Sequence, residues 1–255
     1  MPLVQIEKND RRVTILTLNR PERRNALSLQ LLSELVSAIK MASDDPDRRI
    51  LILRGAGAAF CTGLDLKEAA DQTKAHDTAD LVAETLIALS QSRLVTMAAV
   101  HGAAVAGGAG LMSACDYVVA AEKTKIGYPE VRRGLVAGLV MTFLRRQLRE
   151  RDTRELLLGS DLIDAERAHE IGLVNRVVPA ENVMAEAESF AEKVLQGAPS
   201  AVVQTKRLIE ELWGRSVKAD IQLALQHHMQ ARSSAEASEG IAAFNEKRAP
   251  NWLKT

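Results

Sequence analysis

Two segments of this chain hold residues whose types and spacing suit acid–base chemistry next to a carbonyl group. Residues 99–110 are almost entirely Ala, Gly and Val, and they read as a buried strand, a glycine turn and the start of a helix. A helix that begins on bare glycine backbone exposes N–H groups that stabilise developing negative charge. Farther along, Tyr128-Pro129-Glu130 supplies one carboxylate that could move a proton. An oxyanion site with a single acid/base is enough for enolate chemistry, so the pattern favours an enzyme.

A third candidate is the glycine-rich loop 55–66, which follows the apolar run 50–53. A dinucleotide-binding fingerprint would need Gly or Ala where Phe60 stands, and an acidic residue at the end of a second strand. Neither is present, so we expect Gly63 instead to turn the chain until the amide of Leu64 faces a cavity. The structural alternative is an ordinary strand-to-helix loop with Asp65 as the helix cap.

Each of the other polar or glycine positions also has a purely structural interpretation. Gly107 and Gly108 could serve only close helix–sheet packing, and a lone Glu130 could lie on the surface. The uncharged segment 126–129, directly before Glu130, favours a functional role for this residue, because a carboxylate in apolar surroundings can have its pKa raised. His101 lies in an apolar run and is expected to be a satisfied core histidine.

The elements that must position these residues alternate between strands and helices. We expect strands at 13–18, 50–53, 95–100, 117–120 and around Ile126. Helices are expected from the Ser28 cap to about Ala42 and at 79–90. This alternation predicts a parallel sheet with right-handed crossovers.

The second half of the chain is expected to be mostly helical. Capped helices ending at glycine are predicted at 152–159 and 164–172, followed by a last strand at 173–178. Four further helices are predicted near 181–196, 199–213, 216–232 and 236–247. The fold class is therefore α/β, with a core over residues 1–195 and a helical C-terminal extension over 196–255 that needs a surface to pack on.

Composition excludes several classes of function. The 255 residues balance 33 Lys and Arg against 33 Asp and Glu, which leaves no basic footprint for nucleic acid. Cys61 and Cys115 fit small buried hydrophobes, and no His, Asp or Glu group has metal-ligand spacing. The weakly charged stretch 94–121 is too rich in Gly and Ala to favour a membrane span. With no signal peptide apparent, we expect a soluble, cytoplasmic protein.

Taken together, five ordered motifs resemble those of the crotonase superfamily, also called the enoyl-CoA hydratase/isomerase family. They cover nearly the whole chain, and they are 18–27 (LNRPERRNAL), 59–66 (AFCTGLDL), 99–116 with its Gly107-Gly108 pair and Cys115-Asp116, 126–130 (IGYPE) and 240–250 (GIAAFNEKRAP). The resemblance implies a spiral of ββα units with C-terminal helices that mediate trimerisation, and a homotrimer or dimer of trimers. It implies an acyl-CoA substrate and no separate cofactor, because coenzyme A is part of the substrate.

The resemblance also implies a role for individual residues. The two amides that hold the thioester oxygen belong to Leu64 and Gly107, and Glu130 is the catalytic acid/base. Arg24 and Ala26 lie where the family meets the phosphates and adenine of CoA. Phe244 and Lys247 lie where a C-terminal helix, often from a neighbouring subunit, closes on CoA.

Two departures from the family pattern bear on the reaction. Hydratases of the family usually carry a second glutamate where this chain has Gly110, and two carboxylates hold and activate a water. One carboxylate suffices to move a proton between carbons, so an enoyl-CoA isomerase in fatty acid metabolism is favoured over a hydratase, a lyase or a non-catalytic CoA-ester binding homologue. Tyr128 and Asp65 are the candidates to replace the missing group. The segment 134–141 and the variable region 71–78 are expected to shape the acyl site.

Overall fold

The computed structural model describes residues 1–9 and 12–253, and its centre is a six-stranded sheet with strand order β1-β2-β3-β4-β6-β9. Five of the strands run parallel, as predicted, and they are β2 (Val13–Leu18), β3 (Ile50–Gly55), β4 (Val95–Val100), β6 (Tyr117–Ala121) and β9 (Arg176–Val178). The strand β1 (Val4–Lys8) was not predicted and pairs antiparallel with β2 at the sheet edge. Only Val4 of β1 is buried, so its sequence lacks the apolar pattern of a core strand.

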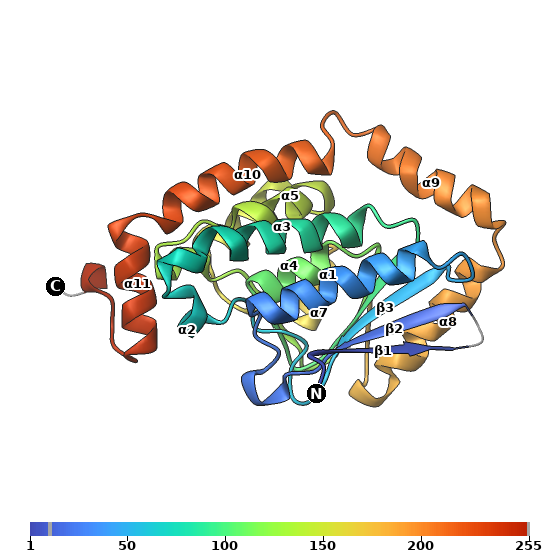
Figure 1. The fold of residues 1–255 in the computed structure, drawn as a ribbon, viewed down its shortest axis with the longest axis horizontal. Coiled ribbons are helices and arrows are strands. Elements are labelled where there is room, and N and C mark those ends of the chain that lie inside the picture. Colours follow the sequence, from blue (N-terminus) through green and yellow to red (C-terminus); the bar gives the residue numbers. More distant parts are fainter. Residues whose placement is uncertain (10–11, 254–255) are drawn as a thin grey trace.

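Helices cover both faces of this sheet (Figure 1). One face, which includes Leu51 and Leu53, packs on α1 (Leu29–Asp44) and α3 (Ala75–Ser90). The opposite face, which includes Ile50 and Ile52, packs on α8 (Val183–Leu195). Burial on both sides explains why the run 50–53 is apolar throughout rather than alternating.

A second, three-stranded sheet carries the segments with candidate chemistry. It consists of β5 (Ala103–Val105), β7 (Lys125–Gly127) and β8 (Ile163–Asp164), with β5 and β7 parallel. The chain continues from β5 into α4 (Gly107–Ser113) and from β7 into a short 3-10 turn, Glu130–Arg133. A short helix α2 (Leu66–Ala69) follows the glycine-rich loop.

The second half is helical, as expected, with some shifted boundaries. It contains α5 (Gly138–Gln147), α6 (Glu150–Arg154), α7 (Ala165–Glu170), α9 (Pro199–Glu211), α10 (Val217–Arg232) and α11 (Ala235–Asn245). Asp164 caps α7 by accepting a hydrogen bond from the Arg167 amide at 2.9 Å. In Figure 1, α10 lies above α3 and α5, and α11 lies beside α2 at the end opposite α9.

Several predicted boundaries were wrong. Helix α3 begins at Ala75 rather than residue 79 because Ala75 already faces the interior. Asp152 is not a cap: it is buried within α6 and pairs with Arg149 at 2.7 Å, and the left-handed residue at the end of the following wide turn is Ser160. The strand expected at 173–178 is formed only by Arg176–Val178, because Leu173 and Val174 pack in the core instead.

The C-terminal extension packs partly on the core. Helix α10 buries Val217 and Ile221 in the same hydrophobic cluster as α1 and α3. Helix α9, by contrast, has no buried residue. No helix in the described part of the chain combines the length and apolar character needed to cross a membrane.

Candidate active site

Three neighbouring chain segments run in the same direction and end at the same edge of the small sheet. Cys61 forms a parallel bridge with Ala104 of β5, and β5 pairs in parallel with β7, so that Val105 faces Gly127. Shortly beyond these paired positions follow Leu64, Gly107 and Glu130. Parallel pairing therefore brings the three residues predicted to do chemistry to one place, although they are far apart in the sequence.

The glycine-rich loop is held in place by a buried asparagine. The side-chain amide of Asn25 donates to the backbone carbonyls of Ala56, Ala59 and Phe60 at 2.9, 2.8 and 3.1 Å. Asn25 is fully buried and has a left-handed backbone conformation with φ of 56°. Asn tolerates this conformation better than most residues, which explains its place in the motif 18–27.

Gly63 lets the loop contact the turn before α4. Its φ is +86°, and a methyl group placed on it would lie 2.9 Å from the Ala106 side chain and 3.3 Å from the Gly107 nitrogen. Ala106 itself has a φ of 52°, a strained conformation for a residue other than glycine. The Leu64 and Gly107 amides donate no hydrogen bond to any residue that the structure describes. Two free amides thus lie on adjoining turns.

The carboxyl group of Glu130 is buried, and one of its two oxygens has no partner. Glu130 is 9% exposed, and among the described residues its Oε2 atom has no hydrogen-bond partner. Burial raises the pKa of Glu130 to about 7, against smaller lowering effects of its own backbone N–H and of Arg133. A carboxyl with such a pKa can both accept and return a proton near neutral pH.

All seven residues predicted from the sequence line one pocket of about 580 Å³. They are Arg24, Ala26, Leu64, Gly107, Glu130, Phe244 and Lys247. Phe244 and Lys247 of the C-terminal region reach the pocket of their own chain. The predicted segment 134–141 contributes a largely apolar wall from Leu135 to Val140. Helix α3 reaches the pocket through Ala79 and Val82, whereas the described side chains of 71–78 do not line it.

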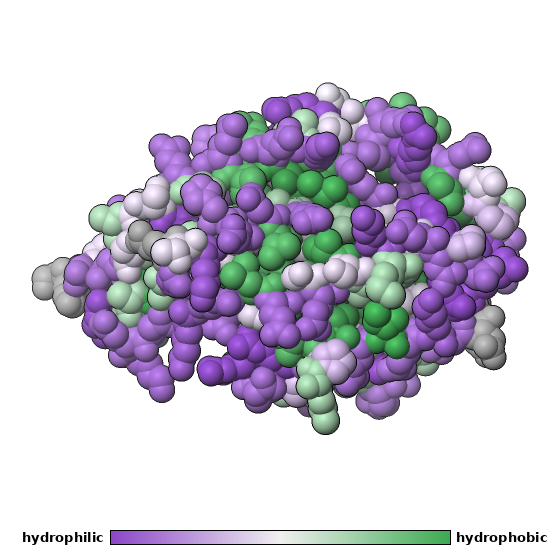
Figure 2. Space-filling model, viewed as in Figure 1, coloured by the Kyte–Doolittle hydropathy of each residue, from purple (hydrophilic) through white to green (hydrophobic). Residues whose placement is uncertain are grey.

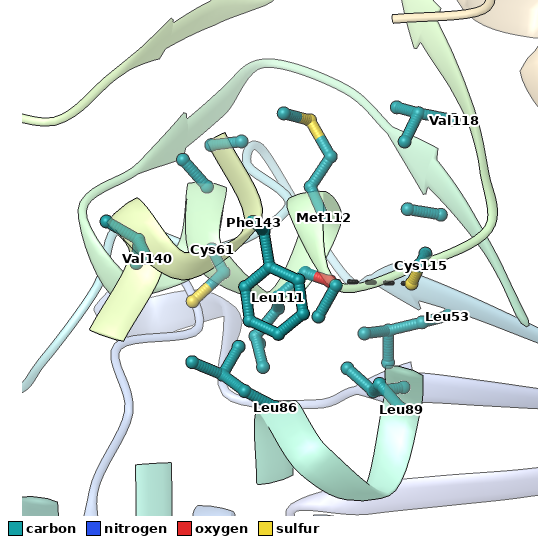
Figure 3. Close-up of a cluster of buried hydrophobic side chains, with 14 of the residues drawn as sticks. Leu53, Cys61, Leu86, Leu89, Leu111, Met112, Cys115, Val118, Val140 and Phe143 are labelled. Carbon is teal, nitrogen blue, oxygen red and sulfur yellow. Dashed lines mark hydrogen bonds between the residues drawn. The ribbon is translucent and has the colours of Figure 1, made fainter. Parts of the chain in front are cut away.

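The place of a second glutamate is filled by an apolar side chain. Gly110 is buried in α4, and a Cβ atom added to it would lie 2.4 Å from Cγ1 of Val140. Figure 3 shows Val140 beside Leu111 and Cys61 in the hydrophobic cluster around α4. A larger residue at position 110 therefore requires Val140 to move or to shrink.

Neither candidate for replacing that glutamate is available. Tyr128 is fully buried, does not line the pocket, and its hydroxyl shares a 2.8 Å hydrogen bond with Ser113. Asp65 lines the pocket, but it pairs with Arg20 at 2.8 Å and accepts from the Lys67 amide to cap α2. Asp65 is therefore the helix cap that the structural alternative expected. Leu64 nevertheless lines the pocket, as the functional interpretation expected.

The histidine and the two cysteines that the sequence did not assign to catalysis lie in structural positions. His101 Nε2 lies 2.9 Å from the Gly57 carbonyl oxygen, so the ring has a partner as predicted, but His101 is only partly buried and does not belong to the core. Both cysteines are buried and free. Within the described ranges, no three His, Cys, Asp or Glu side chains gather as a metal ion would require.

Sequence reasoning assigned no role to Arg133 or His228, and it placed Val140 in the segment expected to shape the acyl site without predicting its contact with Gly110. Arg133 lies 4.6 Å above the ring of Phe244, His228 comes from α10, and Val140 fills the space next to Gly110. The pattern around Glu130 could have indicated Arg133. Nothing in the local sequence distinguishes His228 or Val140 from ordinary helix residues, because only the packing of α10 and α5 brings them to the pocket.

Comparison with known proteins gives consistent results for sequence and fold. The family model described as enoyl-CoA hydratase/isomerase matches residues 8–255. Enoyl-CoA hydratase EchA19 of Mycobacterium tuberculosis is 36% identical over 93% of this chain and 92% of its own length. The 2,3-dehydroadipyl-CoA hydratase of Escherichia coli is 30% identical over 97% of each chain. The crystal structure of an enoyl-CoA hydratase from Mycobacterium avium superposes with a TM-score of 0.87 at 32% identity, covering 99% of this chain and 100% of that one.

Proposed function

The chain belongs to the enoyl-CoA hydratase/isomerase family, and from this premise we propose that it shifts a double bond between the 3- and 2-enoyl positions of an acyl-CoA, with Glu130 as its only acid/base. The observation that carries this proposal is the combination of an unpartnered buried carboxyl at Glu130 with the apolar filling at Gly110. Three carboxyl groups line the described pocket: Asp65 pairs with Arg20, Glu22 is largely exposed beside the same arginine, and Glu130 is buried with an unpartnered oxygen. Glu130 is therefore the carboxyl suited to move a proton, and a double-bond shift needs only one.

In the proposed reaction the free amides and the carboxyl have separate roles. The thioester oxygen accepts hydrogen bonds from the Leu64 and Gly107 amides, so that the charge formed when a proton leaves C2 is stabilised on that oxygen. A single preorganised donor of this kind contributes roughly 10²–10³ in rate. Glu130 takes the proton from C2 and returns it to C4, which leaves the double bond conjugated with the thioester.

Coenzyme A occupies the polar end of the same pocket in this proposal. Arg24 and Ala26 contact its phosphates and adenine, and Phe244 of α11 and Lys247 just after this helix close over it. The acyl chain then lies against the apolar wall of 135–140. No separate cofactor takes part. We also propose that the chain assembles as a homotrimer or a dimer of trimers through its C-terminal region.

Hydration of 2-enoyl-CoA is the second candidate, because relatives such as EchA19 are named hydratases. In that case a water must be activated without a carboxylate at position 110. A hydratase-lyase reaction would need the same additional group. A non-catalytic CoA-ester binding role fits less well, since such a role gives no reason for burying Glu130.

The test compares trans-3-hexenoyl-CoA and crotonyl-CoA with the wild type and with Glu130→Gln, following conjugation by ultraviolet absorbance and water addition by mass. We expect isomerisation that is lost in Glu130→Gln, and no hydration. Efficient hydration by the wild type would replace the isomerase proposal with the second candidate. CoA-ester binding without either activity would leave the non-catalytic role.

A further inference from the structure

A second cavity, of about 340 Å³, lies beside the acyl part of the pocket. Three elements border both spaces in a consistent order. Helix α2 contributes Leu66 and Lys67 to the pocket, and Ala69 and Ala70 at its end border the cavity.

Helix α3 contributes Ala79 and Val82 to the pocket, and Ala75 and His76 at its start border the cavity. On α10, His228 lines the pocket, whereas Met229 and Arg232 line the cavity. The cavity therefore lies next to the pocket along all three elements.

Arg232 is an incompletely satisfied cation in the wall of this cavity. It is 6% exposed, and its Nη2 atom donates to the Ala69 carbonyl at 3.1 Å. Its Nη1 atom is buried and has no hydrogen-bond partner among the described residues, and none of their carboxylates forms an ion pair with it. A buried, unpaired charge is costly, so an anionic ligand would gain a strong, charge-assisted interaction here.

His228 makes the adjoining pocket wall polar. It is 8% exposed, and its Nδ1 atom lies 3.2 Å from the Val136 carbonyl oxygen, so that Nδ1 carries the proton and donates. Burial, with the nearby charge of Arg232, lowers the pKa of His228 and keeps the ring neutral. His228 and Arg232 are separated by four residues, about 6 Å along the helix. An acyl chain that passes His228 thus comes within one helical turn of Arg232.

Building on the proposed function, we propose that the acyl group of the substrate ends in a carboxylate and that Arg232 binds this carboxylate. The interaction selects the substrate at its far end, away from Glu130 and the two amides. It deepens the proposed function by naming the class of substrate: CoA thioesters of dicarboxylic acids.

The test measures binding rather than turnover. Isothermal titration compares saturated dicarboxylyl-CoA esters with monocarboxylyl-CoA esters of matched chain length, such as adipyl-CoA with hexanoyl-CoA, across a series of lengths. In the wild type we expect the dicarboxylyl ester to bind about tenfold more tightly or better at the length that reaches Arg232. Arg232→Met should remove this preference, so that the two esters bind the variant with equal affinity. The control Arg207→Met, which alters an exposed arginine of α9 by the same charge, should keep the preference.

Two results would overturn the inference: no preference at any length in the wild type, or a preference that survives in Arg232→Met. Should Arg232→Met fail to fold, the wild-type series and Arg232→Lys, which retains the charge, still decide it. If inorganic phosphate raises the melting temperature of the wild type but not of the variant, and no ester preference exists, the site takes a free anion and the inference is wrong. Isomerisation of 3-hexenoyl-CoA is measured separately. A failure of the proposed function can therefore be distinguished from a failure of the inference about Arg232.

Discussion

At the scale of single residues, Glu130 carries the most consequential property. Its carboxyl is desolvated by the wall of the pocket and has no hydrogen-bond partner among the described side chains. This environment favours the neutral acid, so that the pKa rises to about 7. The same desolvation that makes Glu130 a competent base near neutral pH makes its ionised form costly to the fold.

The raised pKa predicts a pH-dependent stability difference between the wild type and Glu130→Gln. The folded state holds the proton more tightly than the unfolded state, so this contribution to stability is complete at low pH and is lost as the pH rises through about 7. We expect Glu130→Gln to melt at nearly the wild-type temperature in acid and several degrees higher in mild alkali. Melting curves across this pH range measure the difference. A constant difference at every pH would contradict the assigned pKa.

Position 110 provides a second prediction at the residue scale. Gly110→Glu alone should be destabilised by about 1–3 kcal/mol, because its Cβ atom would overlap Val140. The double variant Gly110→Glu with Val140→Gly creates room for the carboxylate, and we expect it to gain hydration of crotonyl-CoA. Val140→Gly alone is the matched control and should gain none. Urea unfolding and product mass are the measurements, and wild-type stability in the single variant would refute the packing argument.

At the scale of elements, the site depends on contact between the loop 55–63 and the turn that begins α4. Parallel pairing of Cys61 with Ala104, and of β5 with β7, aligns the segments, and Asn25 fixes the loop through three backbone carbonyls. The pairing of these short segments thus sets the positions of the Leu64 and Gly107 amides.

Gly63→Ala tests whether that contact matters. The added methyl group would overlap Ala106 and occupy a left-handed position, which moves the Leu64 amide relative to Gly107. We expect kcat for isomerisation to fall roughly 10²-fold or more, with a smaller change in KM, since a misplaced donor weakens the transition state most. Gly214→Ala, where a methyl group meets no atom within 4 Å, is the control. Equal kcat in both variants would remove Gly63 from the oxyanion argument.

At the scale of the whole molecule, helix α9 lacks a covering surface. Its outward apolar side chains, with the adjoining Trp213, are largely exposed: Leu208 at 52%, Ile209 at 61%, Leu212 at 78% and Trp213 at 46%. In Figure 2 the hydrophobic side chains between α10, α3 and α1 are bordered by hydrophilic outer faces, as expected for helices that pack on a core. The exposed row on α9 is consistent with the proposed contact with another copy of the chain.

Substituting Leu212→Glu should therefore weaken assembly. We expect the wild type to have the mass of a trimer or hexamer by light scattering after size-exclusion chromatography, and the variant to shift toward the monomer at equal concentration. Leu253→Glu, which changes an exposed leucine outside α9, serves as the control. A monomeric wild type would contradict the assembly proposal.

The sequence by itself determined the elements of the sheet and which segments hold chemistry. An alternating pattern predicted β2, an apolar run that suits two-sided burial predicted β3, and five ordered motifs indicated the family. Residues of the candidate site were predictable where glycine or a carboxylate marks them locally, as at Gly63, Gly107 and Glu130. The edge strand β1 was missed because only Val4 is buried, so the segment lacks the pattern of a core strand. The helix α5 was missed although its buried apolar residues recur at helical spacing.

Only the tertiary structure decided what surrounds those residues. The packing of α5 brings Val140 against Gly110, and the packing of α10 brings His228 to the pocket and Arg232 to the neighbouring cavity. The pKa of Glu130 likewise depends on desolvation by segments far from it in the sequence. The physical reason is that local sequence sets backbone conformation and apolar periodicity, whereas exclusion of water and steric fit arise from contacts between distant segments.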